Sequence, residues 1–161
     1  AASRDEVHES NQSSPTPSKN RLAPFNPTST SAQRVAIDLL NLTPSDTLYD
    51  LGCGDGRLLR TSAKSIPGLK CVGIEYDAKH ANRAKEALEK DDDDDDETIT
   101  DRITILHEDV MNATSRICNE ATAVFVYLVP SGLKAVTPIL ERVRQKPNGR
   151  VASYMFAVPD W

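Results

Sequence analysis

Cysteine, histidine and long hydrophobic runs are all scarce in this chain. Only three of its 161 residues are cysteines, at positions 53, 71 and 118, and they form no Cys-x-x-Cys pair. A small, odd number of cysteines argues against a disulfide framework and is typical of reduced thiols inside a cell. No apolar stretch is long enough to span a bilayer. The sequence therefore predicts an intracellular protein, cytoplasmic or mitochondrial, with no transmembrane segment.

Histidine clusters and an excess of positive charge are absent as well. The three histidines lie at positions 8, 80 and 107 without the spacing of metal ligands, so no metal site is predicted. The formal net charge is −5, but seven of the acidic residues lie in the run 91–97. Without that run, 19 basic residues face 17 acidic ones, which leaves a net charge of +2. A body so close to neutral gives no strong signal of nucleic-acid binding.

The chain is long enough for one domain with a substantial core. Residues 1–22 are rich in serine, asparagine, proline and charge, and we expect them to form a disordered tail. The folded domain is expected over residues 23–161, with the acidic run 91–97 as a solvated loop insertion. Because the chain starts without methionine and stops at Trp161, we expect it to be a piece of a longer protein.

Apolar periodicity predicts strands and helices in alternation. The first helix is expected near Thr30, where Thr30-Ser31-Ala32-Gln33 resembles a capping box. Its apolar residues follow at helical spacing: Ala32, Val35, Ala36, Leu39 and Leu40. Strands are expected at 47–49, 70–75, 102–107, 121–129 and about 150–157, with helices between them. This order predicts an α/β fold of the Rossmann-like, doubly wound type, a mainly parallel sheet with helices on both faces.

The most informative stretch is Asp50-Leu51-Gly52-Cys53-Gly54-Asp55-Gly56, which joins the first strand to a helical pattern. Glycines at alternate positions permit a tight turn and let a ligand approach the bare backbone at the start of a helix. Such a turn favours a nucleotide-like cofactor, although an ordinary strand-to-helix turn has the same pattern. Ligands of open parallel sheets bind beyond the carboxyl ends of the strands, which is where this turn is predicted to lie.

Two carboxylates follow later strands and lie on the same predicted edge. Glu75 ends the second strand, 19 residues after Gly56; it could accept hydrogen bonds from a ribose diol or be a solvated strand-end residue. Asp109 follows the third strand. It could accept from an adenine amino group beside the Val110 amide, or cap a helix over 111–118. Tyr127, at the end of the fourth strand, is expected at this edge too.

Together, Asp50–Gly56, Gly73-Ile74-Glu75 and Glu108-Asp109 resemble the successive motifs of class I, seven-β-strand, S-adenosylmethionine-dependent methyltransferases. The acidic residue before the first glycine separates this pattern from the dinucleotide-binding Gly-x-Gly-x-x-Gly pattern. The resemblance implies S-adenosyl-L-methionine as the cofactor, with Asp50 near its cationic end. It also implies cofactor-binding roles for the matched residues and their neighbours: Asp50, Leu51, Gly52, Cys53, Gly54, Glu75, Tyr76, Asp109 and Val110.

A narrower resemblance covers most of residues 24–161. Its parts are Pro24-Phe25-x-Pro27-Thr28, Val126-Tyr127-Leu128-Val129-Pro130, Gly149-Arg150-Val151-Ala152-Ser153 and, near the end, Phe156 with Pro159-Asp160-Trp161. They are similar to the small protein-lysine methyltransferases of mitochondrial ATP synthase subunit c and the adenine nucleotide translocase, and to their short prokaryotic relatives. Against that family the acidic run 91–97 is an insertion. The last two strands of the family's sheet are expected to be missing, which would expose a sheet edge.

This second resemblance implies transfer of methyl groups to a lysine side chain of a protein. Tyr127 is then the candidate for the methyl-transfer face, where it would position the amine rather than act as acid or base. Phe25, on a flexible lid, and Pro130 would form walls of a substrate channel, while each could equally be ordinary packing. The alternatives are a methyltransferase for RNA or a small molecule, and a binding-only scaffold with the same fold. Asp50 disfavours a nicotinamide dehydrogenase, and the oligomeric state stays open.

Overall fold

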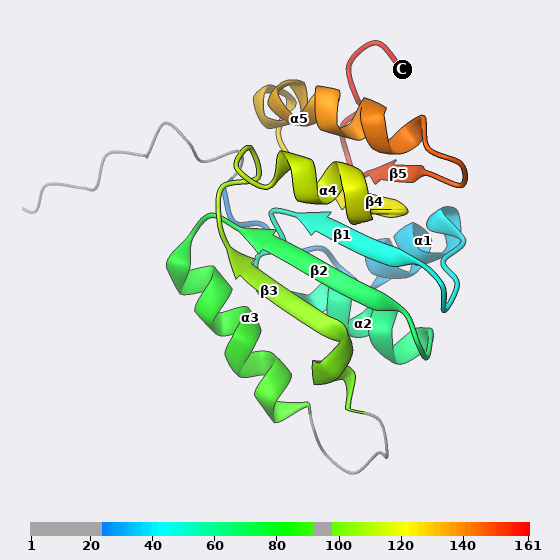
Figure 1. The fold of residues 1–161 in the computed structure, drawn as a ribbon. Helices are drawn as coiled ribbons and strands as arrows, with labels where there is room; N and C mark the ends of the chain where they lie inside the picture. Colours follow the sequence, from blue (N-terminus) through cyan, green and yellow to red (C-terminus); the bar gives the residue numbers. More distant parts are fainter. Residues whose placement is uncertain (1–23, 92–97) are drawn as a thin grey trace, which may run out of the picture.

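In the computed structural model, which describes residues 24–91 and 98–161, a five-stranded parallel sheet forms the centre of the molecule (Figure 1). Its strands are β1 (Thr47–Leu51), β2 (Lys70–Glu75), β3 (Ile103–His107), β4 (Ala123–Val126) and β5 (Arg150–Ser153). They lie in the order β3-β2-β1-β4-β5, and every neighbouring pair is parallel. The predicted tail at 1–22 and residues 92–97 of the predicted acidic loop lie outside the described residues.

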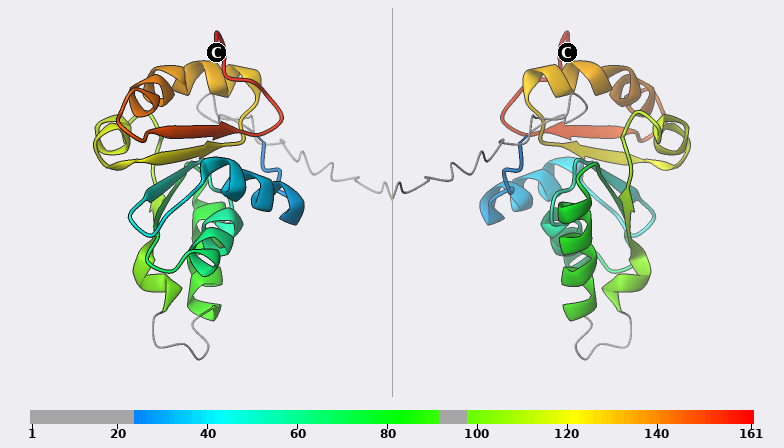
Figure 2. Two further views of the ribbon diagram at one scale, coloured as in Figure 1. Left: turned by 90° about the vertical axis from the view of Figure 1, so that its right-hand side faces the viewer. Right: turned by 90° about the vertical axis from the view of Figure 1, so that its left-hand side faces the viewer.

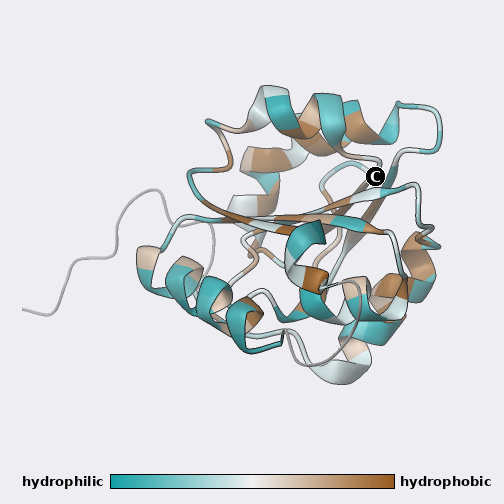
Figure 3. Cartoon of the chain, turned by 60° about the horizontal axis from the view of Figure 1, so that its bottom comes forward, coloured by the Kyte–Doolittle hydropathy of each residue, from teal (hydrophilic) through white to brown (hydrophobic). Residues whose placement is uncertain are grey.

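Helices cover both faces of this sheet (Figures 1 and 2). One face packs against α1 (Thr30–Leu40), α2 (Arg57–Ser65) and α3 (Ala78–Lys90), and the other against α4 (Thr114–Glu120) and α5 (Pro130–Arg144). A short 3-10 turn, η1 (Ile99–Arg102), precedes β3. Each face buries its own apolar cluster, and Figure 3 shows brown, apolar residues on the strands between the two helical layers. The predicted doubly wound α/β fold is confirmed.

Two strands are shorter than predicted. β4 ends at Val126 rather than at residue 129, because the chain leaves the sheet at Tyr127 and enters α5 at Pro130. β5 ends at Ser153 rather than at residue 157, because Met155 adopts a left-handed backbone conformation (φ 67°) that a strand does not allow. β5 is an outer strand of the described sheet, and all four of its residues are only partly buried.

The apolar face predicted for the first helix is partly wrong. The helix is capped by Ser29, whose hydroxyl accepts from the Ala32 amide, and not by a box that starts at Thr30. The buried stripe consists of Ala32, Gln33, Ala36 and Leu40. Val35 and Leu39 face solvent instead, with 56% and 73% of their surfaces exposed. The prediction failed because a polar residue, Gln33, occupies a buried position that an apolar pattern does not reveal.

A buried carboxylate ties the strands together at their amino ends. Asp46 accepts hydrogen bonds from the guanidinium of Arg150 (2.6 Å) and from the hydroxyls of Thr122 (2.6 Å) and Thr43 (2.9 Å). Burial alone would raise the pKa of Asp46, but these hydrogen bonds outweigh it and lower the pKa to about 2. Arg150 also donates to the carbonyl of Leu40, which links β5 to the end of α1.

Candidate functional site

A cavity opens at the carboxyl ends of β1 and β4, where the strand order reverses. In doubly wound sheets this reversal leaves a crevice in which ligands bind. The cavity, together with the solvent at its mouth, takes up about 810 Å³. Ten of the predicted site residues line it: Phe25, Asp50, Gly52, Cys53, Gly54, Glu75, Tyr76, Asp109, Val110 and Tyr127.

The glycine loop forms one wall of the cavity and is fixed by Glu75. Gly54 adopts φ +57°, and a β-carbon at this position would lie 2.9 Å from the ring of Phe25, so a larger residue would strain the backbone and displace that ring. The Glu75 carboxylate accepts from the Gly54 amide (2.8 Å) and from the Asp77 amide (2.9 Å). Glu75 thereby joins the loop to the start of α3. Its oxygens retain acceptor capacity for a hydroxyl pair of a ligand.

Asp50 gives the cavity its electrostatic character. Its side chain is only 4% exposed, and burial, together with the charges of Glu75 and Asp55, raises its pKa to about 8. The neighbouring Asp50 and Glu75 carboxyl groups favour a ligand with positive charge, whereas Asp55 is already paired with Arg57 at 2.6 Å. Burial also raises the pKa of the neighbouring Cys53 thiol, with the charge of Asp50 adding to the effect, so this cysteine is a neutral wall and not a nucleophile.

Asp109 and Val110 line the part of the cavity beside β3. The Asp109 carboxylate accepts from the Met111 amide (2.9 Å) and closes a short turn. The alternative prediction, a helix cap for residues 111–118, is wrong because α4 begins only at Thr114 and follows Ala113. The apolar Val110 lines the cavity although only 4% of its surface is exposed.

Tyr127 also lines the cavity, and the ring of Tyr154, which does not line it, packs against Tyr127. The hydroxyl of Tyr127 accepts from the side-chain amide of Asn26 (2.6 Å) and donates to the sulfur of Met155 (3.1 Å). The ring of Tyr154 meets that of Tyr127 edge to face, with centroids 4.8 Å apart. Tyr127 is therefore held in place by two segments far from it in the sequence.

Two predicted site residues do not line the cavity. Leu51 is fully buried in the apolar cluster beneath α4 and α5, because successive residues of β1 point to opposite faces of the sheet and Asp50 points to the cavity. Pro130 is the exposed first residue of α5. Asn26 and His80 are among the lining residues that the sequence analysis missed. His80 lies in the first turn of α3, three residues after the Asp77 cap. The only signal for it in the sequence was its position shortly after Glu75.

The described residues 24–91 and 98–161 hold no group of three or more histidine, cysteine or acidic side chains that could bind a metal ion. Among these same residues, no helix is long and apolar enough to cross a membrane.

Comparison with known proteins agrees with this geometry. Residues 50–161 match the ANTKMT methyltransferase domain. A protein-lysine N-methyltransferase of Saccharolobus islandicus (strain REY15A) is 30% identical over 138 residues, which are 86% of this chain and 80% of the relative. An RNA methyltransferase from Salinibacter ruber, solved with S-adenosyl-L-homocysteine, has 28% identity, a TM-score of 0.69, and coverage of 84% of this chain and 82% of its own.

A more distant solved structure shares the fold. It is an S-adenosylmethionine-dependent methyltransferase from Geobacter sulfurreducens with 23% identity and a TM-score of 0.61, and the match covers 80% of this chain and 49% of the other.

The sheet, the glycine loop and the acidic cavity define a class I S-adenosylmethionine-dependent methyltransferase. The cofactor fits the residues present, because Asp50 suits its cationic end and Glu75 suits its ribose. Within that class, the chain belongs to the ANTKMT methyltransferase family.

Proposed function

We propose that this protein transfers methyl groups from S-adenosyl-L-methionine to the side-chain amine of a lysine in another protein. The main observation behind this proposal is that the acidic cofactor cavity lies next to Tyr127 and the uncharged, partly aromatic side chains that contact it. The relative from Saccharolobus islandicus, itself a protein-lysine N-methyltransferase, supports the choice of acceptor.

Different residues of the cavity bind different parts of the cofactor. Glu75 accepts from the ribose hydroxyls, while Asp109 and the Val110 amide bind the adenine edge. Asp50 faces the ammonium and sulfonium end, where its negative charge is neutralised. The glycine loop from Gly52 to Gly54 lets the ligand approach the backbone closely.

Tyr127 positions the acceptor. When bound, the cofactor supplies a methyl group on a sulfonium, which an amine accepts by direct in-line displacement. An aromatic surrounding favours the neutral amine by desolvation, and the proton of the lysine leaves to solvent. The Tyr127 hydroxyl then accepts from an N–H of the amine, which leaves the lone pair free for the methyl group, and Phe25 excludes water around it. This mechanism requires that the lysine amine be placed correctly, and it requires no strong base.

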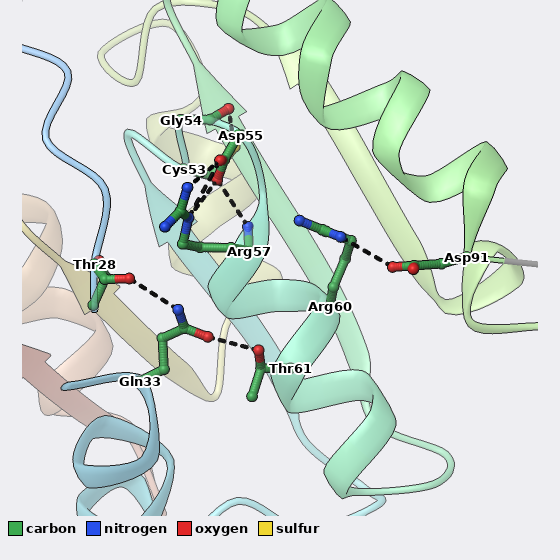
Figure 4. A network of polar contacts seen from close by, with 9 residues as sticks. All are labelled: Thr28, Gln33, Cys53, Gly54, Asp55, Arg57, Arg60, Thr61 and Asp91. Atoms are coloured by element: carbon green, nitrogen blue, oxygen red, sulfur yellow. Dashed lines mark hydrogen bonds and ion pairs between the residues drawn. The ribbon is translucent and has the colours of Figure 1, made fainter. Parts of the chain in front are cut away.

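An RNA acceptor is the second candidate, because the neighbour from Salinibacter ruber is an RNA methyltransferase. The cations of α2, of which Arg57 lines the cavity, argue against it. Arg57 pairs with Asp55 at 2.6 Å and Arg60 with Asp91 at 3.1 Å, as Figure 4 shows. Lys64 also pairs with Asp91, at 3.1 Å. Cations that are neutralised by nearby carboxylates give little attraction for phosphates.

The acceptor is tested by incubating the protein with labelled S-adenosyl-L-methionine and cell extract. We expect label in protein that survives ribonuclease and that mass spectrometry assigns to lysine. Label that ribonuclease removes would show that the acceptor is RNA and not lysine. The Tyr127→Phe variant should lower the turnover about tenfold and leave the cofactor affinity unchanged, because it removes one orienting hydroxyl.

We also propose an intracellular location, cytoplasmic or mitochondrial. Its support is that Cys53, Cys71 and Cys118 are all buried, unpaired thiols. Fluorescence microscopy of the tagged protein tests it, and secretion into the medium would contradict it.

A further inference from the structure

Residues Pro24–Thr28, which we call the strap, lie across the cavity although they precede the whole sheet in sequence. All five line the cavity. The end of the strap is fixed to the fold by Gln33, which donates to the Thr28 carbonyl (2.9 Å) and accepts from the Thr61 hydroxyl (2.6 Å), as Figure 4 shows. The strap therefore has a firm attachment to α1 and α2 at its carboxyl end.

The other end of the strap is held by a ring contact. Phe25 stacks on His80, with ring centroids 4.2 Å apart and planes at 16°. The same ring covers Gly54, where a β-carbon would lie 2.9 Å from it. Phe25 thus spans from the glycine loop to the first turn of α3, over the two elements that Glu75 joins.

His80 is unusual in this position because one of its two ring nitrogens has no hydrogen-bond partner. The residue is only 9% exposed, and its Nδ1 is buried without a hydrogen bond in the described part of the chain. A buried nitrogen without a partner is unfavourable. The ring contact between Phe25 and His80 offsets part of this cost.

We propose that His80 is a positioning residue of the cofactor site and acts through Phe25. The stacked pair holds the strap closed over the glycine loop. Closure then places the amide of Asn26 at 2.6 Å from the Tyr127 hydroxyl, on the side where the acceptor enters. The inference rests on the proposed function, since it assumes that the cofactor binds under the strap.

The test measures release of the cofactor. Full-chain protein is loaded with tritium-labelled S-adenosyl-L-methionine and chased with unlabelled S-adenosyl-L-homocysteine. An aromatic stack contributes about two- to tenfold in an equilibrium. We expect His80→Ala to accelerate release by about that factor, and Phe25→Ala to do the same. The double variant should release no faster than either single one, because both changes break the same contact.

Two variants separate positioning from general stability. His80→Phe keeps the stack and removes the unpartnered nitrogen, so it should release the cofactor at the native rate and unfold at a higher Tm. Asn82→Ala, at an exposed position of the same helix, should change neither quantity. Native release from a folded His80→Ala protein would overturn the inference, as would equal acceleration in His80→Phe.

The proposed function and this inference fail in different ways. Absence of lysine methylation by the unaltered protein, with cofactor binding intact, would contradict the acceptor but not the role of His80. If both hold, His80→Ala should also lower kcat, since the Tyr127 hydroxyl loses the partner that the strap carries.

Discussion

Asp50 lies beside two further carboxylates, Glu75 and Asp55, with 4% of its surface exposed. Because its pKa in the folded protein is raised to about 8, the folded state binds a proton that the unfolded state has lost over most of the range from pH 4 to pH 8. The contribution of Asp50 to stability therefore falls as the pH rises through this window. A residue that destabilises the empty protein is expected where it serves a ligand.

The first prediction concerns Asp50→Asn. It should weaken S-adenosyl-L-methionine binding about 10- to 100-fold, because one charge-assisted interaction is lost. It should also make the empty protein more stable than the native one, with a gap in unfolding free energy that widens from pH 5 to pH 8.5. Calorimetry and urea unfolding measure the two effects. A gap that is the same at both pH values would contradict it, and Asp101→Asn is the exposed control.

The second prediction is that cofactor binding releases a proton near pH 7. A cation beside Asp50 lowers its pKa, so the affinity should rise between pH 6 and pH 8. In calorimetry at pH 7, the apparent binding enthalpy should be more negative in Tris than in phosphate, since Tris gives more heat when it takes up a proton. The Asp50→Asn variant should show no such difference, and an equal enthalpy in the two buffers for native protein would refute the linkage.

Some residues of the site could be predicted from the sequence, and others could not. The glycine loop, Glu75 and Asp109 were predicted because each follows a strand end, and strand ends of a parallel sheet meet at one edge. Leu51 was misplaced because a motif does not say which face of β1 a residue takes. Asn26 was missed because its partner, Tyr127, is 101 residues away.

At the scale of elements, the joint between β2 and α2 depends on Gly73. A β-carbon there would lie 2.6 Å from both the Cys53 sulfur and the Leu59 side chain. Gly73→Ala should therefore push α2 and the glycine loop away from β2, costing about 1–3 kcal/mol of stability and weakening cofactor binding. Urea unfolding and calorimetry test this third prediction.

A matched control for Gly73→Ala lies on the adjacent strand. Thr104→Ala changes an exposed residue of β3, which pairs with β2, and should leave both stability and affinity close to native. If the Gly73→Ala protein binds the cofactor as tightly as the Thr104→Ala protein, the packing of the glycine loop on β2 does not determine the cofactor affinity.

Elements were easier to predict than their boundaries. Strand β2 was predicted with its observed bounds, residues 70–75, because an apolar run is a local signal. The ends of β4 and β5 were not, since Tyr127 and Tyr154 leave the sheet to meet one another. That contact between two chain segments has no local signal.

For the whole molecule, Asp46 and Arg150 link α1, β1, β4 and β5. Since Asp46 is 6% exposed, removing its partner leaves a buried charge, and Arg150→Ala should cost about 3–5 kcal/mol of stability. The exposed Arg142→Ala is the control. Urea unfolding measures this fourth prediction, and a loss below about 1 kcal/mol would contradict it.

The pH dependence of this network has the opposite sign to that of Asp50. The pKa of Asp46 is lowered to about 2, so its stabilising effect is complete above pH 4 and is lost as the pH falls toward 2. The native protein should lose stability over this range, whereas Asp46→Asn should lose less. Urea titrations at pH 5 and pH 2.5 compare them, and parallel losses would refute the assignment.

The burial of Asp50 has a consequence for the life of the protein in a cell. A ligand that binds only the folded state stabilises it in proportion to the logarithm of its concentration over Kd. In the empty protein the buried Asp50 side chain holds a proton at a cost in stability, so S-adenosyl-L-methionine stabilises the folded state when it binds there, besides supplying the methyl group. Its steady-state abundance should therefore follow the supply of methyl donor, and starved cells should degrade it faster.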